Sequence, residues 1–286
     1  MIKKFLNKLF RLAYRGVEWL APPLAGRLAI YIFFRPMRNP RPRREQPILD
    51  SAKIERRFFS GYYPRAIAES YYTKYTWGQG EPILLVHGWG GRATQFSSIV
   101  SEFVDAGYQV VAFDAPAHGD SPGRRTNLLE FDGILRDLST EYGRFQAIVA
   151  HSLGAVASAR ALTAGTTANR LVTIGAPATM EHLLEGFAQA VPATDRSLTF
   201  LKSHLVTLAD QGIEEFSLLT HYPNLPTPTL TIHDRQDKSV AFSQAERLID
   251  SNPKAKLIAT EGLGHNRILS DPNVVSEILE FATSTD

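Results

Sequence analysis

Cysteine is absent from the 286-residue chain. The protein therefore contains no disulfide, no zinc–thiolate site and no cysteine nucleophile. This composition is typical of a reducing compartment, so we expect a cytoplasmic protein. Internal repeats and low-complexity tracts are missing as well, which argues against a solenoid and against a disordered chain.

Acidic residues are scarce near the start of the chain. Residues 1–65 hold 15 Lys and Arg against 4 Asp and Glu, whereas residues 66–286 hold 16 against 25. The formal net charge of +2 therefore hides a basic N-terminal segment attached to an acidic body. Because the body is net acidic, we expect no nucleic-acid partner.

Long apolar runs are also missing. The run from Leu24 to Phe34 contains Arg27 and has about half of the roughly 20 residues that cross a bilayer. Before it, apolar residues recur at three- and four-residue spacing opposite Lys and Arg, which predicts a basic amphipathic helix that ends at Pro22-Pro23. Arg11 and Arg15 would interrupt the apolar core of a signal peptide, so we do not expect secretion. The apolar stripe consists of Ile2, Phe5, Leu6, Leu9, Ala13, Val17 and Leu20.

Two interpretations of residues 1–34 stay open. Lys and Arg opposite Phe, Leu and Trp suit an anionic membrane surface, which would give a peripheral contact on the inner face of a membrane. The alternative is a helix packed on the body, which is the more usual role of an amphipathic helix. The Arg- and Pro-rich stretch from Arg35 to Pro47 predicts an extended connector. Residues 1–60 are therefore expected to form an arm and a connector.

From residue 61 on, short β-rich runs alternate with longer amphipathic stretches. This pattern predicts an α/β domain over residues 61–286, with a doubly wound, mostly parallel sheet covered by helices on both faces. A helical insertion over residues 178–226 is longer than ordinary connections. Ligands of such sheets bind beyond the carboxyl ends of the strands. The expected strands are Ile83–His87, Val110–Asp114, Ile148–Ala150, Leu171–Ile174, Thr229–Ile232 and Lys256–Ala259.

A candidate nucleophile lies between an expected strand and an expected helix, in Ala150-His151-Ser152-Leu153-Gly154. A sharp turn there would raise the Ser152 hydroxyl above the sheet, and the small residues Ala150 and Gly154 leave room for it. The start of the following helix favours negative charge nearby. A serine between a strand and a helix also commonly serves as an N-cap, so this pattern alone leaves both roles open.

A serine hydroxyl needs a neighbouring base before it can attack. Gly262-Leu263-Gly264-His265 follows the last expected strand, and its glycines allow the loop to bring His265 to the top of the sheet. Asp237, after another strand, is the candidate that orients this imidazole, and Asp234 is the alternative that would instead hold the turn. The chain order Ser, Asp, His is the one expected for a nucleophile elbow.

With these motifs the body resembles the α/β-hydrolase family over nearly everything after the arm. The resemblance implies that the backbone amides of Trp89 and Leu153 form an oxyanion hole, and that His87 and Gly88 lie beside the substrate. Ala117 stands where the family's pattern has a glycine, so we expect that turn to be slightly altered. The matching segments are His87-Gly88-Trp89-Gly90, Asp114 to Ser121, the Ser152 turn, the Asp237 segment and Gly264-His265.

The resemblance also makes residues 178–226 a small helical cap over the site. Phe187 and Phe216 are candidates to line an acyl pocket there. We therefore predict a serine hydrolase that cleaves small or medium carboxylic esters through an acyl-enzyme, with no cofactor and no metal. Two alternatives remain, namely a hydrolase-fold binding or receptor protein with slow turnover, and a membrane-associated lipase, thioesterase or acyltransferase.

Overall fold

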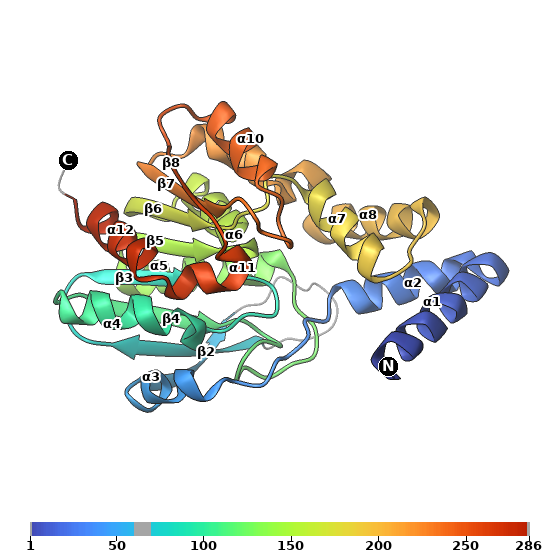
Figure 1. The fold of residues 1–286 in the computed structure, drawn as a ribbon, viewed down its shortest axis with the longest axis horizontal. Coiled ribbons are helices and arrows are strands. Elements are labelled where there is room, and N and C mark those ends of the chain that lie inside the picture. The colour runs from blue at the N-terminus through green and yellow to red at the C-terminus, as the bar shows by residue number, and fades with distance from the viewer. Residues whose placement is uncertain (1, 60–69, 285–286) are drawn as a thin grey trace.

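Within residues 2–59 and 70–284, which the computed structural model describes, the chain forms an eight-stranded sheet (Figure 1). For residues 2–8 and 209 the description is limited to the backbone. The strand order is β1-β2-β4-β3-β5-β6-β7-β8, in which the β1–β2 and β2–β4 pairs are antiparallel and the other pairs are parallel. This arrangement confirms the predicted α/β fold. The strands are β1 Lys53–Phe59, β2 Ser70–Trp77, β3 Pro82–Val86, β4 Gln109–Asp114, β5 Phe145–His151, β6 Ala168–Ile174, β7 Thr229–Asp234 and β8 Lys256–Thr260.

Helices cover both faces of the sheet. In the central strands, Leu84 and Ile148 belong to one hydrophobic cluster, and their chain neighbours Leu85 and Val149 belong to the other. Successive strand residues point to opposite faces, so strands that are covered on both sides are apolar throughout. The first cluster lies under α5 Leu128–Tyr142 and α6 Leu153–Thr163, and the second under α4 Ser97–Asp105 and α12 Pro272–Thr283. Shorter helices are α3 Gln46–Asp50, α9 Leu218–His221, α10 Ser243–Ser251 and α11 Gly264–Arg267.

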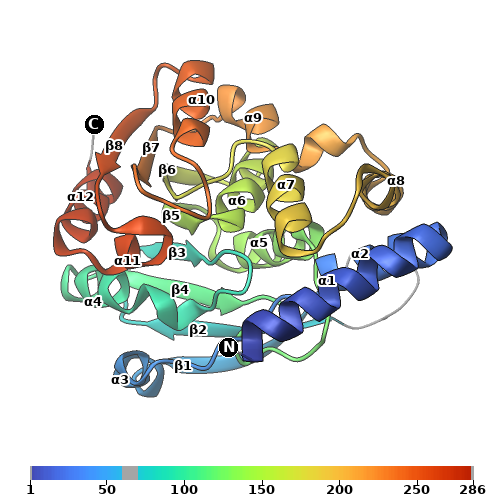
Figure 2. The ribbon, with the colours of Figure 1, turned by 45° about the vertical axis from the view of Figure 1, so that its right-hand side comes forward.

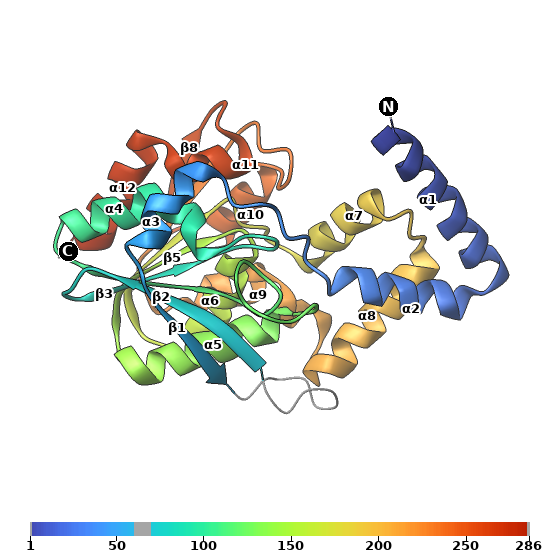
Figure 3. The same ribbon diagram turned by 90° about the horizontal axis from the view of Figure 1, so that it is seen from below.

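Two helical segments lie beyond the carboxyl edge of the parallel strands (Figure 1). The chain between β6 and β7 contains α7 Met180–Ala190 and α8 Asp195–Ala209, and we call α7 and α8 the cap helices. The arm consists of α1 Ile2–Leu20 and α2 Pro22–Phe33, which pack on the cap helices (Figures 2 and 3). Gly26 of α2 lies so close to Phe200 of α8 that a Cβ at residue 26 would lie 2.7 Å from the Cγ of that ring.

The sheet begins earlier in the chain than the sequence pattern indicates. The segment Lys53–Phe59, expected to belong to the connector, pairs with β2 along its whole length. It is an edge strand, and edge strands commonly carry charged side chains that discourage pairing with other molecules. Its charges, including those of Glu55 and Arg56, therefore obscure the apolar alternation that marks a half-buried strand.

None of the helices in the part of the chain that the structure describes has both the length and the apolar character required to cross a membrane.

Candidate active site

Ser152 occupies a strained turn between β5 and α6. Its backbone has φ 52° and ψ −122°, a left-handed conformation that residues other than glycine rarely adopt. Such strain costs about 1–3 kcal/mol and persists only where the surroundings enforce it. Here the Ser152 amide donates a hydrogen bond to the carbonyl of Ile174 at 2.9 Å. The turn thus anchors the serine between two parallel strands, with its side chain partly exposed.

Glycines permit this close packing. A Cβ at Gly88 would lie 2.7 Å from the Cβ of Ser152 and 3.3 Å from its Oγ, so the backbone after β3 passes directly beside the hydroxyl. A Cβ at Gly154 would lie 2.4 Å from the carbonyl oxygen of Val86. Only glycine fits at either position without moving the neighbouring residue. The small residues around the predicted nucleophile are therefore required because larger side chains would collide with their neighbours.

His265 and Asp237 meet at the carboxyl ends of β7 and β8. The Nδ1 of His265 lies 2.7 Å from Oδ2 of Asp237, and the carboxylate is almost fully buried. The other oxygen, Oδ1, accepts hydrogen bonds from the amides of Ser239 and Val240. Burial opposes ionisation of this carboxyl group, but the hydrogen bonds from His265 and from the two amides together hold the pKa of Asp237 below its ordinary value.

Gly175 connects this pair to the serine turn. It follows Ile174, whose carbonyl binds the Ser152 amide. A Cβ at Gly175 would lie 3.1 Å from Nδ1 of His265 and 3.5 Å from Oδ2 of Asp237. The backbone of Gly175 therefore lies against the imidazole–carboxylate pair and next in sequence to the residue that anchors Ser152.

Asp234, the alternative to Asp237, has other partners. Its Oδ2 accepts from the hydroxyl of Thr260 and the amide of Leu263, both at 2.9 Å, and its Oδ1 accepts from the amide of Gln236. These bonds join the end of β7 to the loop that carries His265. Asp234 thus fixes the position of the loop, and Asp237 is the carboxylate in contact with the imidazole.

His151, directly before the serine, makes a contact that the motif alone does not predict. Its Nε2 lies 2.9 Å from the carbonyl oxygen of His265, and the two rings are 4.6 Å apart. Burial and the nearby His265 ring lower the pKa of His151 to about 3, so its imidazole stays neutral. A neutral imidazole whose Nε2 carries the proton donates to that carbonyl, and this bond holds the backbone of His265 in place.

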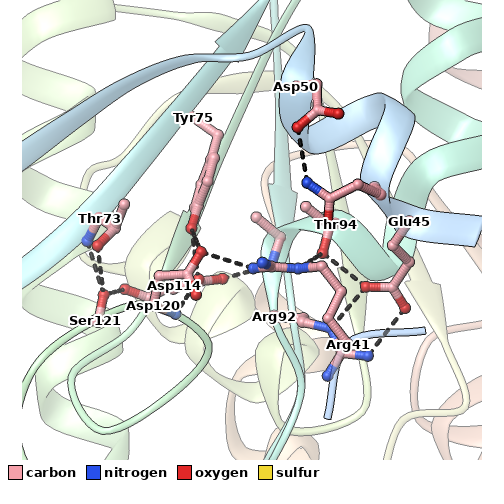
Figure 4. A network of polar contacts seen from close by, with 12 residues as sticks. Arg41, Glu45, Asp50, Thr73, Tyr75, Arg92, Thr94, Asp114, Asp120 and Ser121 are labelled. Carbon is pink, nitrogen blue, oxygen red and sulfur yellow. Dashed lines mark hydrogen bonds and ion pairs between the residues drawn. The ribbon is translucent and has the colours of Figure 1, made fainter. Parts of the chain in front are cut away.

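The turn after β3 is anchored by an ion pair with the connector (Figure 4). Glu45 is buried and accepts from Nε of Arg92 at 2.6 Å, from Nη2 of Arg92 at 3.0 Å and from the hydroxyl of Thr94 at 2.7 Å. Arg41 bridges the same Thr94 to Asp120. Burial alone would raise the pKa of Glu45, but the bonds from Arg92 and Thr94 outweigh it and lower that pKa. The connector therefore braces the loop that carries Gly88 and Trp89.

A second carboxylate supports the same loop from β4. Asp114 accepts from the amide of Ala93 at 2.7 Å, from the hydroxyl of Tyr75 at 2.8 Å and from the amide of Asp120 at 2.8 Å (Figure 4). Ala117, in the turn that follows, takes φ 64°. The turn thus keeps a left-handed backbone at this position, where the family pattern has a glycine.

The other predicted site residues, His87, Trp89 and Leu153, differ in how far they are exposed. His87 is fully buried, its Nδ1 lies 2.7 Å from the carbonyl oxygen of Gly88, and its Nε2 accepts from the amide of Ala115. Trp89 is partly exposed and its ring stands edge-on to His118. Leu153 opens α6 and is nearly buried.

Phe187 and Phe216, the two phenylalanines predicted to line an acyl pocket, pack against other apolar side chains. Phe187 packs edge-on against Phe33 of the arm, with ring centroids 5.2 Å apart, and belongs to the arm–cap cluster around Tyr14. Phe216 is buried in the main core. The acyl-pocket role of both rings stays a prediction.

The sequence motifs did not indicate Glu45, Arg92, His151 or Gly175. One signal for Glu45 was present, because it is the only acidic residue in the basic stretch 35–49. An isolated carboxylate among arginines is a candidate for a buried ion pair. Among the described residues, no group of three or more His, Asp or Glu side chains is arranged to hold a metal ion.

Comparison with known proteins agrees with this architecture. The model of the alpha/beta hydrolase family matches residues 83–278. A non-heme chloroperoxidase of Kitasatospora aureofaciens is 37% identical over 82 residues, which span 27% of this chain and 30% of that protein.

Two solved structures show the same fold. An esterase from Exiguobacterium antarcticum matches with a TM-score of 0.59 and 16% identity, over 78% of this chain and 100% of its own. A bromoperoxidase from Bacillus anthracis matches with a TM-score of 0.61 and 19% identity, over 80% of this chain and 99% of its own. With the family model covering more than half of the sequence, the chain belongs to the alpha/beta hydrolase family.

Proposed function

We propose that the protein is a serine hydrolase that cleaves carboxylic esters through an acyl-enzyme. The observation that carries the proposal is the contact of 2.7 Å between His265 and a buried, ionised Asp237, at the same edge of the sheet as the strained Ser152 turn. Asp237 accepts from Nδ1–H of His265, which leaves Nε2 unprotonated and able to accept the serine proton. Family membership and the esterase fold neighbour support the same class of chemistry.

In the first half of the reaction, Ser152 Oγ attacks the ester carbonyl while Nε2 of His265 takes the hydroxyl proton. The tetrahedral intermediate collapses, the alcohol leaves with the proton returned by His265, and the acyl group stays on Ser152. In the second half, His265 removes a proton from water, which attacks the acyl-enzyme. The intermediate collapses, His265 returns the proton to Oγ of Ser152, and the carboxylic acid leaves.

We assign stabilisation of the intermediate to the backbone amides of Trp89 and Leu153. Leu153 directly follows the nucleophile and begins α6, and Trp89 directly follows Gly88, whose backbone lies beside the Ser152 hydroxyl. The buried Glu45–Arg92 pair would hold the Trp89 amide in position to donate to the intermediate. Loss of one such donor typically slows an acyl transfer about 100- to 1,000-fold.

The test is steady-state turnover of p-nitrophenyl acetate by the wild type, Ser152→Ala and Ser158→Ala. Ser158 is a matched control because it lies in the same helix and its hydroxyl only bonds the carbonyl of Gly154. We expect Ser152→Ala to lose nearly all turnover and Ser158→Ala to keep it. Equal rates for Ser152→Ala and the wild type would refute the assignment. A parallel series with phenyl thioacetate separates an esterase from a thioesterase.

A further inference from the structure

Helix α1 packs on the cap helices through the side that carries Tyr14 and Glu18. The Tyr14 hydroxyl lies 3.2 Å from the carbonyl oxygen of Ala25 and 3.0 Å from the hydroxyl of Ser197. Glu18 accepts from both the amide and the hydroxyl of Thr194, and from the hydroxyl of Ser197. Only 7% of the Glu18 surface is exposed. The docking of α1 therefore combines these polar contacts with an apolar cluster of Tyr14, Ala25 and Val191, against which Val17 also packs.

The side of α1 opposite Tyr14 and Glu18 carries exposed apolar side chains. At about 100° per residue, Leu12 lies about 160° around the helix axis from Tyr14. Leu12 is 60% exposed and Trp19 is 82% exposed, and Leu9 and Leu20 are more than half exposed. Contiguous exposed apolar side chains of this kind mark an interaction site. We call Leu9, Leu12, Arg15, Trp19 and Leu20 the outer face of α1.

The charges of the arm indicate what kind of partner binds this face. Residues 1–34 contain six Lys or Arg and a single acidic residue, Glu18. Glu18 is buried against the cap, whereas Arg15 is exposed on the same side of the helix as Leu12 and Trp19. The surface that α1 presents to solvent is therefore apolar and basic, with no exposed acidic side chain among its described residues. Two copies of the chain would bring like charges together across this face, whereas an anionic surface neutralises them.

We propose that the outer face of α1 binds the surface of an anionic lipid bilayer, with the helix lying in the plane of the interface. Leucine and tryptophan side chains enter the boundary between headgroups and acyl chains, and the arginine contacts lipid phosphates. Tryptophan favours this boundary because its ring is apolar and its N–H is polar. The contacts of Glu18 and Tyr14 keep the cap attached to the arm in this arrangement. The proposal is independent of the ester chemistry.

Co-sedimentation of the full-length protein with vesicles tests the proposal. The vesicles are pure phosphatidylcholine or phosphatidylcholine with 30% phosphatidylglycerol, at low and high salt. We expect binding to the anionic vesicles at low salt and weaker binding at high salt, because salt screens the charge contribution. Trp19→Ser and Leu12→Ser each should lower the partition coefficient by about 10-fold or more. Arg15→Gln should weaken binding to anionic vesicles and leave any binding to neutral vesicles unchanged.

Ile54→Ser is the matched control, since Ile54 is 49% exposed on the edge strand β1. It should bind vesicles like the wild type, and all variants should keep the wild-type melting temperature because the changed side chains face solvent. No binding of the wild type to anionic vesicles, or equal losses in Ile54→Ser and Leu12→Ser, would overturn the proposal. A concentration-dependent dimer in sedimentation velocity that Leu12→Ser abolishes, without vesicle binding, would assign the face to a second copy instead.

Discussion

Replacing Asp237 by Asn is the substitution whose effect follows most directly from the observed contacts. The carboxylate accepts at both oxygens, from His265 at Oδ2 and from the amides of Ser239 and Val240 at Oδ1. An asparagine has a single acceptor oxygen. If that oxygen keeps the two backbone amides, its NH₂ group faces Nδ1 of His265. The imidazole must then carry its proton on Nε2, where it can no longer accept the serine proton.

The substitution affects both kcat and the free energy of unfolding. The wrong tautomer in this type of site lowers kcat by about 10⁴-fold, which corresponds to ~5.4 kcal/mol of transition-state stabilisation. The fold loses one charge-assisted hydrogen bond, which contributes about 1.5–3 kcal/mol to the free energy of unfolding. Activity should therefore fall far more than stability.

The assay pairs kcat for p-nitrophenyl acetate with urea unfolding, for Asp237→Asn and for Asp234→Asn as the comparison. Asp234 accepts from Thr260 and Leu263 but does not contact His265, so its variant should lose comparable stability and keep much more of the activity. An Asp237→Asn enzyme with wild-type kcat, or one that loses activity only because it is unfolded, would refute the role given to Asp237.

Further predictions concern three residues around the site, Glu45, Gly88 and His151. Glu45→Ala leaves the Arg92 guanidinium buried without its partner and should lower the free energy of unfolding by about 3–5 kcal/mol in urea titrations. Because the folded pKa of Glu45 lies below its ordinary value of 4.5, the carboxylate stabilises the fold fully above that pH. The difference in unfolding free energy between wild type and Glu45→Gln should therefore shrink as pH falls through the folded pKa, and a constant difference down to pH 3 would contradict this. Gly88→Ala places a Cβ 2.7 Å from that of Ser152 and should abolish ester turnover while the circular dichroism spectrum stays native. His151→Phe removes the hydrogen bond to the His265 carbonyl and should lower kcat by about 10-fold; because the pKa of His151 is about 3, the acid limb of the pH–rate profile should not move.

The fold was accessible from the sequence because its central strands are buried on both faces. Runs such as Pro82–Val86 and Phe145–His151 are nearly continuous apolar segments, and the helices between them have clear three- to four-residue periodicity. The edge strand Lys53–Phe59 could not be predicted from the sequence. Only one of its edges pairs with another strand, the other edge faces solvent, and many of its residues are charged. A local pattern could not show that this segment pairs with a strand that begins more than ten residues later.

The predicted site residues stand out because their roles impose local backbone requirements. The Ser152 turn needs small flanking residues, and the loop of His265 uses Gly262 and Gly264 at positive φ, so both leave a signature in the sequence. The supporting contacts leave none, because they join distant segments. Glu45 meets Arg92 across 47 positions and His151 meets the carbonyl of His265 across 114.

The outward orientation of α1 is likewise invisible to periodicity. Hydrophobic spacing identifies an amphipathic helix but does not say which side contacts the protein. That choice depends in part on polar partners at the start of α8, since Thr194, which precedes the helix, and Ser197 both bind Glu18. The side by which α1 docks can be recognised only when these partner hydroxyls are seen.

Covalent labelling with a fluorophosphonate tests most directly whether Ser152 is the activated nucleophile. Intact-protein mass spectrometry of the wild type, Ser152→Ala and Ser158→Ala, followed by peptide mapping, gives the number and the position of adducts. We expect one adduct on Ser152 in the wild type and in Ser158→Ala, and none in Ser152→Ala. An adduct on another residue, or equal labelling of Ser152→Ala and the wild type, would contradict it.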